Sequence, residues 1–272
     1  MLFRAFCLLQ PIILLNLLWG SRTADAAISA QFALWVILTA RGVSSMRSQI
    51  FGKVLYKGDP AANSVALTFD DGPSVPYTSR TLDILKEHGV KATFFVIGKN
   101  VAAHPEIAGR MHDEGHEFGN HTYSHPWMFR IIFSAIRKDI ELCQTEISRI
   151  TGSRPRFFRQ PIGMNNPGAM KVLDGLGMVM VGWQTRAYDG VDARTDAIVR
   201  RVLEGVRPGG IILLHDGVDE KLGLDRSCTV DALREIIPAL KARGYNFKTV
   251  SELTGIVNMQ PVPGQEKFVN AH

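Results

Sequence analysis

The chain has 272 residues, of which 46% are hydrophobic and 21% are charged, and these ordinary globular fractions exclude a wholly disordered or collagen-like protein. The net charge of +5 comes from 31 basic and 26 acidic residues, and because no basic run with interleaved aromatic residues concentrates it, we expect no nucleic-acid partner. Three cysteines are too few for a disulfide scaffold or a cysteine-rich zinc module.

Two apolar stretches occupy the N-terminal region, at residues 5–19 and 26–40. Each has about 15 residues, fewer than the roughly 20 that a membrane-spanning helix needs. The first stretch follows Arg4 and precedes the sequence ADA at residues 24–26, a pattern typical of a signal peptide and its cleavage site. We therefore expect residues 1–40 to be a signal peptide, a membrane anchor or both, and residues 41–60 to be a linker.

The basic residues do not give one orientation in a membrane. Arg4 favours a cytoplasmic N-terminus, and Arg41, Arg47, Lys53 and Lys57 favour the cytoplasm for the chain beyond the second stretch. If both stretches span the membrane, the main domain is cytoplasmic, and if only one spans, it lies outside. We expect an anchored or exported protein whose catalytic domain is extracytoplasmic.

Strand and helix patterns alternate from residue 64 onwards. Short apolar runs predict strands at residues 64–69, 92–96, 116–119, 156–158, 177–182, 211–214 and 247–250. Helical spacing predicts helices at residues 77–88, 103–114, 134–150, 167–176, 195–206 and 230–242. This alternation predicts a parallel sheet of βαβ units over residues 61–255, followed by a tail at 256–272, and it fits an open sheet as well as a closed or partly closed barrel.

Residues suited to metal binding follow two of the predicted strands. Asp70 and Asp71 come after the first strand, and like charges this close raise one pKa unless a cation relieves them. His121 and His125 follow the third strand, and their spacing lets both imidazoles face one point. Two imidazoles and one carboxylate form a three-ligand set that leaves a position open for water, as in catalytic zinc sites.

Other polar or aromatic residues follow the later strands. Arg159 can hold a carboxylate in its ionised form. Trp183 and Asp189 follow the fifth strand, and His215 follows the sixth; a histidine there suits general acid catalysis because its ordinary pKa is near neutrality. All of these residues lie after strand C-termini, where the active sites of parallel α/β folds assemble.

Four ordered motifs resemble those of a known family. They are TFDDGP at residues 68–73, HTYSH at 121–125, RQPIG at 159–163 and LLH at 213–215, and they are similar to motifs of the polysaccharide deacetylases (carbohydrate esterase family four, the NodB homology domain). The resemblance covers about residues 65–250. It implies a distorted (β/α)7 barrel, here preceded by a hydrophobic membrane segment, with one divalent ion: Zn²⁺ first, with Co²⁺, Ni²⁺ or Mn²⁺ as alternatives.

The resemblance also implies a role for each motif residue. Asp71, His121 and His125 would be the metal ligands. Asp70 would be the general base, oriented by Arg159. His215 would be the general acid, with Asp189 as its partner. The implied substrate-binding residues are Pro161, Ile162, Gly163, Trp183 and Leu213, with the backbone N–H of Ile162 as an oxyanion donor.

Two motifs depart from the family pattern. Ile162 stands where the family usually has Tyr, and Arg186 and Gly190 replace an Asp and a Trp of the fourth motif. These changes remove aromatic surface from the pocket, so the motifs do not identify which acyl group and which sugar the protein binds. We expect a metal-dependent N-deacetylase acting on N-acetylated amino sugars of a cell-envelope polysaccharide or oligosaccharide. The alternatives are a deacetylase or deformylase of a lipid-linked amino sugar, and a catalytically inactive carbohydrate-binding relative.

Overall fold

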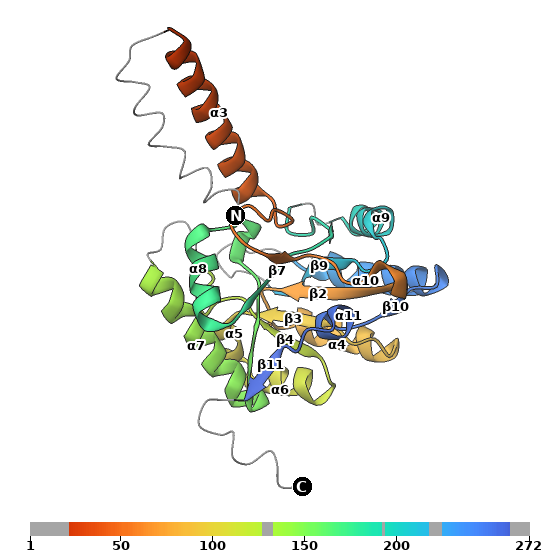
Figure 1. Ribbon diagram of the computed structural model, residues 1–272. Coiled ribbons are helices and arrows are strands. Elements are labelled where there is room, and N and C mark those ends of the chain that lie inside the picture. Colours follow the sequence, from red (N-terminus) through yellow and green to blue (C-terminus); the bar gives the residue numbers. More distant parts are fainter. Residues whose placement is uncertain (1–21, 127–132, 192–193, 218–224, 262–272) are drawn as a thin grey trace.

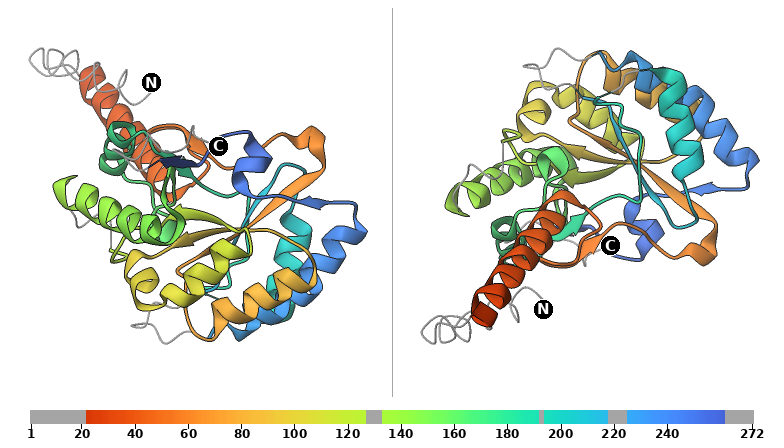
Figure 2. Two further views of the ribbon diagram at one scale, coloured as in Figure 1. Left: turned by 90° about the horizontal axis from the view of Figure 1, so that it is seen from below. Right: turned by 90° about the horizontal axis from the view of Figure 1, so that it is seen from above.

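A curled parallel sheet forms the centre of the computed structural model, which describes residues 22–126, 133–191, 194–217 and 225–261. Its nine strands follow the order β1-β7-β6-β4-β3-β2-β9-β8, with β10 beside β2. The sheet curls into a half-barrel (Figures 1 and 2). It stays open because, among the described strands, no pairing joins β1 at one end to β8 at the other. The predicted α/β fold with a parallel sheet is confirmed, in this open form rather than as a complete seven-stranded barrel.

Seven strands of this sheet correspond to the predicted ones. They are β2 (Ser64–Asp70), β3 (Thr93–Val96), β4 (Glu117–Asn120), β6 (Phe157–Phe158), β7 (Val179–Val181), β9 (Ile211–His215) and β10 (Asn246–Phe247). Strand β2 is buried along its whole length, which its apolar and β-branched sequence favours. It pairs in parallel with β3 and β9, in a register that places Asp70 opposite both Phe95 and His215.

Four short strands were not predicted. Strands β1 (Val54–Leu55) and β8 (Thr185–Arg186) add to the two ends of the sheet. Strands β5 (Ser153–Pro155) and β11 (Met259–Pro261) form a separate antiparallel pair. Strand β1 comes from the segment expected to be a linker, and β11 comes from the segment expected to be a tail.

Helices flank the sheet (Figure 2). They are α4 (Tyr77–Glu87), α5 (Gly98–Ala103), α6 (Pro105–Asp113), α7 (Phe133–Thr151), α8 (Pro167–Leu176), α9 (Thr195–Gly205), α10 (Ser227–Ala242) and α11 (Val250–Thr254), with 3₁₀ turns η1 (Pro60–Ala62) and η3 (Pro161–Gly163). The largest apolar cluster packs β2, β3 and β9 against α4, α6, α9 and α10. A second cluster packs α7 and α8 against β6 and β7.

Two predicted elements are wrong in their extent. The single helix expected over residues 103–114 is divided into α5 and α6, because Pro105 lacks an N–H for a continuous helix and begins a new one. The strand expected over residues 247–250 ends at Phe247. Thr249 instead caps α11 in a capping box with Glu252, so Val250 starts a helix.

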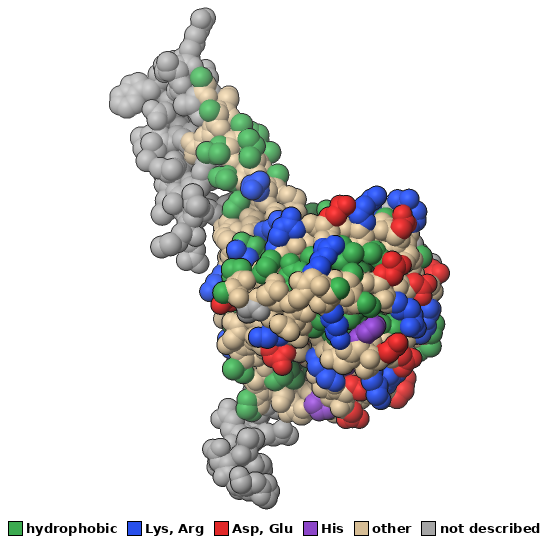
Figure 3. Space-filling view, turned by 90° about the vertical axis from the view of Figure 1, so that its right-hand side faces the viewer, with side chains coloured by type: hydrophobic (Ala, Val, Ile, Leu, Met, Phe, Trp, Pro, Cys, Tyr) green, Lys and Arg blue, Asp and Glu red, His purple; other side chains and the backbone are tan. Residues whose placement is uncertain are grey.

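Helix α3 (Arg22–Ser44) projects from the rest of the molecule (Figures 1 and 3). Five of its large apolar side chains, at residues 32 and 34–37, are exposed, from 38% for Trp35 to 64% for Phe32. The apolar stretch predicted at residues 26–40 lies within this helix, and the one at residues 5–19 lies outside the described residues. Within the described parts of the chain, no helix is both long and apolar enough to cross a membrane.

The end of α3 is hydrogen-bonded to the segment that follows η3. The Asn165 backbone N–H donates to the Val43 carbonyl (2.9 Å), and its Nδ2 donates to the carbonyls of Gly42 (3.1 Å) and Ser45 (2.8 Å). Farther along, Met46 is buried against the core, and β1 pairs in parallel with β7. Residues 42–55 therefore pack directly against the sheet.

Candidate metal centre and active site

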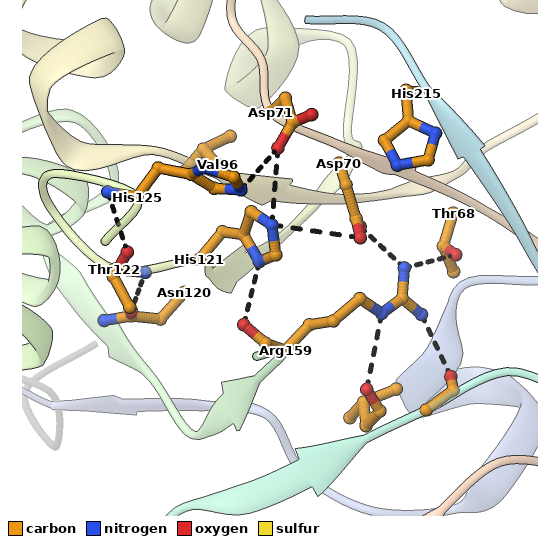
Figure 4. A network of polar contacts seen from close by, with 12 residues as sticks. Thr68, Asp70, Asp71, Val96, Asn120, His121, Thr122, His125, Arg159 and His215 are labelled. Atoms are coloured by element: carbon orange, nitrogen blue, oxygen red, sulfur yellow. Dashed lines mark hydrogen bonds and ion pairs between the residues drawn. The ribbon is translucent and has the colours of Figure 1, made fainter. Parts of the chain in front are cut away.

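The parallel register brings the predicted site residues to one end of the sheet (Figure 4). Asp70 ends β2 and is followed by Asp71, while His121 follows the last residue of β4. His215 ends β9, beside Asp70 in the register. Arg159 follows β6 and extends toward Asp70. Residues from four strand ends therefore meet around one centre.

Asp71, His121 and His125 form a group that could hold a metal ion. Oδ1 of Asp71 lies 3.4 Å from Nε2 of His121 and 3.2 Å from Nε2 of His125. One potential ligand atom from each residue lies within 4.8 Å of the other two. Oδ2 of Asp70 lies 4.0 Å from Nε2 of His121, so a second carboxylate adjoins the group without belonging to it.

The hydrogen bonds around this group fit a cation between its members. Nδ1 of His121 lies 2.8 Å from the backbone carbonyl of Arg159, and because a carbonyl only accepts, Nδ1 carries the proton and Nε2 presents a lone pair. Oδ1 of Asp71 is buried, and no described residue donates a hydrogen bond to it. Two acceptors that face each other need a positive charge between them, so the donor set suits a divalent ion held by two nitrogens and one oxygen.

Asp71 has the protonation state that a metal ligand needs. Burial alone raises the pKa of Asp71, but hydrogen bonding to His121 and His125 as protonated donors, and the charge of His215, outweigh it and hold the pKa well below its ordinary range. A cation bound between neutral imidazoles and the carboxylate favours the ionised form in the same way. The carboxylate is therefore ionised at neutral pH. The backbone of Asp71 has a φ of +75°, a conformation that non-glycine residues adopt mainly where the surrounding structure enforces it.

Helix α7 stabilises the loop that carries His125. Oδ1 of Asn120 accepts from the Thr122 N–H (2.9 Å), and Oγ1 of Thr122 accepts from the His125 N–H (3.1 Å). Oδ2 of Asp139 accepts from the Tyr123 N–H (3.1 Å). Thr122 and His125 both have a positive φ, so these bonds stabilise an otherwise unfavourable loop conformation. The sequence analysis missed Asp139, which occupies an ordinary polar position of an amphipathic helix.

Arg159 fixes the carboxylate of Asp70. Its side chain is fully buried, and Nη1 donates to Oδ1 of Asp70 and to Oγ1 of Thr68, both at 2.7 Å. Nε and Nη2 donate to the carbonyls of Val181 (3.3 Å) and Gly182 (3.1 Å). Burial lowers the pKa of Arg159, and the charge of Asp70 opposes this without cancelling it. A guanidinium held at four acceptors gives Asp70 one orientation (Figure 4).

His215 and Asp189 form a second pair, in which Asp189 is buried and the side chain of His215 is 14% exposed. Nδ1 of His215 lies 2.8 Å from Oδ1 of Asp189, while Oδ2 of Asp189 accepts from the His215 N–H (2.8 Å) and the Thr229 hydroxyl (3.0 Å). Burial lowers the pKa of His215, but the negative charge of Asp189 more than offsets it, so the pKa is raised. Burial raises the pKa of Asp189, yet His215 outweighs this and the pKa is lowered. The pair therefore favours a protonated imidazole.

The predicted substrate-binding residues lie in two places. Ile162, in η3, is 37% exposed and has a φ of 65°, a strained conformation that costs about 1–3 kcal/mol. Pro161 is buried and Trp183 is half-buried. A Cβ added to Gly163 would lie only 2.6 Å from the ring of Trp183. Leu213 lies within β9 and is 2% exposed. The loop of η3 and Trp183 are therefore in close contact, whereas Leu213 is part of the core.

Two buried charged residues near the site were given no role in the sequence analysis. Asp216 accepts a hydrogen bond from the Thr78 hydroxyl at 2.6 Å. Burial, with the charge of Asp71 adding to it, raises the pKa of Asp216 to about 7. The other residue, Arg226, lies 3.8 Å from Asp71. The only sequence signal for Asp216 was its position next to His215, and an arginine just before a predicted helix is typical of a surface position.

Comparisons with known proteins agree with the geometry. The family model "Polysaccharide deacetylase" matches residues 57–181. The chain is 38% identical over 198 residues to a peptidoglycan-N-acetylglucosamine deacetylase of Bacillus cereus, covering 73% of this chain and 70% of that one. It is 39% identical over 207 residues to a chitooligosaccharide deacetylase of Bradyrhizobium, covering 73% and 94%.

Solved structures resemble the chain as well. A crystal structure of a peptidoglycan N-acetylglucosamine deacetylase aligns with a TM-score of 0.71 at 36% identity, covering 75% of this chain and 94% of that one. A pseudoenzyme of the CE4 family from Bacillus anthracis aligns with a TM-score of 0.67 at 31% identity, covering 74% and 68%. Similarity of fold alone therefore does not separate active members from an inactive one, and the site residues must do so.

Proposed function

The chain belongs to the polysaccharide deacetylase family, and we propose that it hydrolyses the acetamide of N-acetylated amino sugars in a cell-envelope polysaccharide or oligosaccharide. The observation that carries this proposal is that two ion pairs flank the metal-binding group. One is the buried pair of Asp70 with Arg159, and the other joins buried Asp189 to the partly exposed His215. Carbohydrate binding alone requires neither an oriented base nor a charged acid. The relatives named for peptidoglycan and chitooligosaccharide support these polymers as the substrate class.

We assign Asp71, His121 and His125 as the ligands of one divalent ion. Zinc is the first choice, because two imidazoles and one carboxylate with an open position form a ligand set of catalytic zinc. Cobalt, nickel and manganese accept the same donors. When bound, such an ion supplies Lewis acidity, which polarises an amide carbonyl and lowers the pKa of water.

The residues around the ion divide the proton transfers between them. Asp70, oriented by Arg159, takes the proton of the attacking water. The backbone N–H of Ile162 donates a hydrogen bond to the developing oxyanion. His215, kept protonated by Asp189, gives its proton to the departing nitrogen. The products are acetate and a free amino sugar.

We further propose that the protein works outside the cytoplasm. Residues 1–40 would export or anchor it, and residues 61–255 would form the deacetylase domain. The exposed apolar side chains of α3, some of which are visible in Figure 3, support attachment to a membrane, because an exposed apolar patch marks a site of contact with lipid or protein. A cysteine introduced on the surface of the deacetylase domain tests which side of the membrane the domain occupies, because a membrane-impermeant thiol reagent added to intact cells labels it only if it lies outside the cytoplasm.

A lipid-linked amino sugar is the second candidate substrate. Asn165 binds the end of α3 directly beside the loop that carries Ile162. Anchoring through α3 would therefore keep the site close to a bilayer. The replacements at Ile162 and Gly190 also leave less aromatic surface for stacking a long glycan.

Acetate release by the full chain distinguishes the candidates. The substrates are peptidoglycan, chitooligosaccharides and a lipid-linked N-acetyl sugar, each with and without a chelator, and Asp70→Asn serves as the inactive control. We expect chelator-sensitive release from a polymer or oligosaccharide. Release from the lipid-linked sugar alone would favour the second candidate. If the folded, metal-loaded protein is no more active than the control on any of the three substrates, the proposal is contradicted. The inactive carbohydrate-binding relative would then be the favoured interpretation.

A further inference from the structure

We propose that Arg226 is a positioning residue that connects the metal-binding half of the site to the general-acid half. This inference rests on the proposed function and adds a residue to it. Arg226 directly precedes α10 and is 3% exposed, and the partners of its guanidinium are groups of the protein itself. It lies outside the four motifs that identified the site, and its role is inferred from the groups that its guanidinium binds.

The guanidinium of Arg226 reaches three separate segments. Nε donates to the carbonyl of Gly217 (2.7 Å), in the loop after β9. Nη1 donates to the carbonyl of Asp189 (3.1 Å), in the loop after β8. Nη2 lies 3.8 Å from Oδ2 of Asp71, just after β2. A planar group with donors in three directions suits this arrangement, whereas a point charge does not.

The contact with Asp71 gives the two oxygens of that carboxylate different partners. A buried guanidinium is costly unless a negative charge compensates it, and among the described residues the carboxylate of Asp71 is the only one within ion-pair distance. Oδ2 faces Arg226, while Oδ1 faces the imidazoles of His121 and His125. Arg226 therefore keeps one oxygen directed at the position of the ion.

The other two hydrogen bonds act on the general-acid half. The carbonyl bound by Nη1 belongs to Asp189, whose side chain contacts Nδ1 of His215 at 2.8 Å. The carbonyl bound by Nε belongs to Gly217, two residues after His215. Arg226 thus holds both segments that position the imidazole of His215, and it also holds the metal ligand Asp71. Loss of the Arg226 side chain would release all three segments.

Gly190 lies beside this arrangement but does not have to be glycine for it to form. A Cβ added at Gly190 would lie 3.7 Å from Nη1 of Arg226 and 3.9 Å from Cε1 of His215, and both are ordinary van der Waals distances. A side chain at position 190 would therefore start beside Arg226 and His215 without displacing either.

Two substitutions of Arg226 and a matched control test the inference in the full chain. Arg226→Met removes the charge and all three contacts, and Arg226→Lys keeps only the charge. Arg234→Met is the control, since Arg234 lies on the same helix with its side chain 57% exposed and pairs with Glu87. Zinc affinity is measured by competition with a chromophoric chelator, and kcat and KM at saturating zinc.

We expect Arg226→Met to weaken zinc binding roughly 10- to 100-fold, the usual effect of removing a partner of a metal ligand. At saturating zinc its kcat should fall at least about 10-fold with KM unchanged. Arg226→Lys should bind zinc more tightly than Arg226→Met and still lose kcat, because an ammonium cannot donate in the same three directions. The control should match the wild type in both measurements.

A purely structural role would lower the melting temperature but leave zinc affinity and kcat per folded, zinc-loaded molecule unchanged, and that result overturns the inference. So does zinc binding by Arg226→Met at wild-type strength or tighter. If Arg226→Met does not fold, Arg226→Lys decides, and a wild-type kcat in that variant overturns the inference. If the wild type releases acetate from no substrate, the proposed function fails, while the zinc comparison still tests Arg226.

Discussion

Replacing Asp70 by Asn should abolish turnover while the metal stays bound. Asn has nearly the shape of Asp but cannot take a proton from water, and a general base is typically worth about 10²- to 10⁴-fold in rate. We therefore expect kcat to fall by at least about 100-fold. Zinc content should not change, because Asp71, His121 and His125 keep their positions in the variant.

The same substitution should lower stability, because it removes the negative partner of Arg159. The two side chains are 2.7 Å apart, with exposures of 5% for Asp70 and 0% for Arg159. Removing one partner of a buried ion pair costs about 3–5 kcal/mol. At roughly 2–4 °C per kcal/mol for a protein of this size, the melting temperature should fall by about 6–20 °C.

A double variant separates the two effects. Asp70→Asn combined with Arg159→Met removes the uncompensated charge, so it should regain part of the lost melting temperature without regaining activity. The assays are calorimetric unfolding, zinc content and acetate release. A single variant that keeps more than about a tenth of wild-type kcat would refute the general-base role. A melting temperature lowered by less than about 2 °C would refute the argument from the buried pair.

Three further substitutions test other parts of the site. His121→Ala should lose zinc and activity together, by more than the roughly 10- to 100-fold expected for an outer partner; a zinc titration that matches the wild type would rule out this ligand. Asp189→Asn removes the charge that raises the pKa of His215. Because a general acid works below its pKa, the alkaline limb of the kcat profile should move to lower pH, and an unmoved limb would contradict the pairing. Gly190→Trp restores aromatic surface and should raise kcat/KM on chitooligosaccharides; a neutral or harmful effect, in a protein already efficient on them, would show that Gly190 does not set this preference.

The sequence located the long, buried elements of the fold but not the short ones. Strand β2 and helix α8 were predicted almost to the residue, because an apolar run and a helical period each extend over several residues. Strands β1 and β8 have two residues each, too few to show any period. Their conformation comes from pairing with β7 and β9, which are distant in sequence. The division at Pro105 was visible in the sequence and should have ended the predicted helix there.

The site shows a similar division. The motif residues could be recognised because each follows a strand, and parallel strands bring those positions together. Arg226 and Asp139 could not, because their importance lies in contacts with Asp71 and with the His125 loop. A lone arginine before a helix, or an aspartate on a helix surface, has no local pattern that separates it from an ordinary solvated residue.

Strand β1 has a practical consequence for producing the protein. The family match begins at residue 57, after β1 has ended. A truncated protein starting there would leave the backbone of β7 unpaired on one side and would remove the three carbonyls to which Asn165 donates. An unpaired strand is a template for intermolecular pairing, so such a protein should aggregate during expression, whereas one that starts before Gly42 keeps both sets of partners.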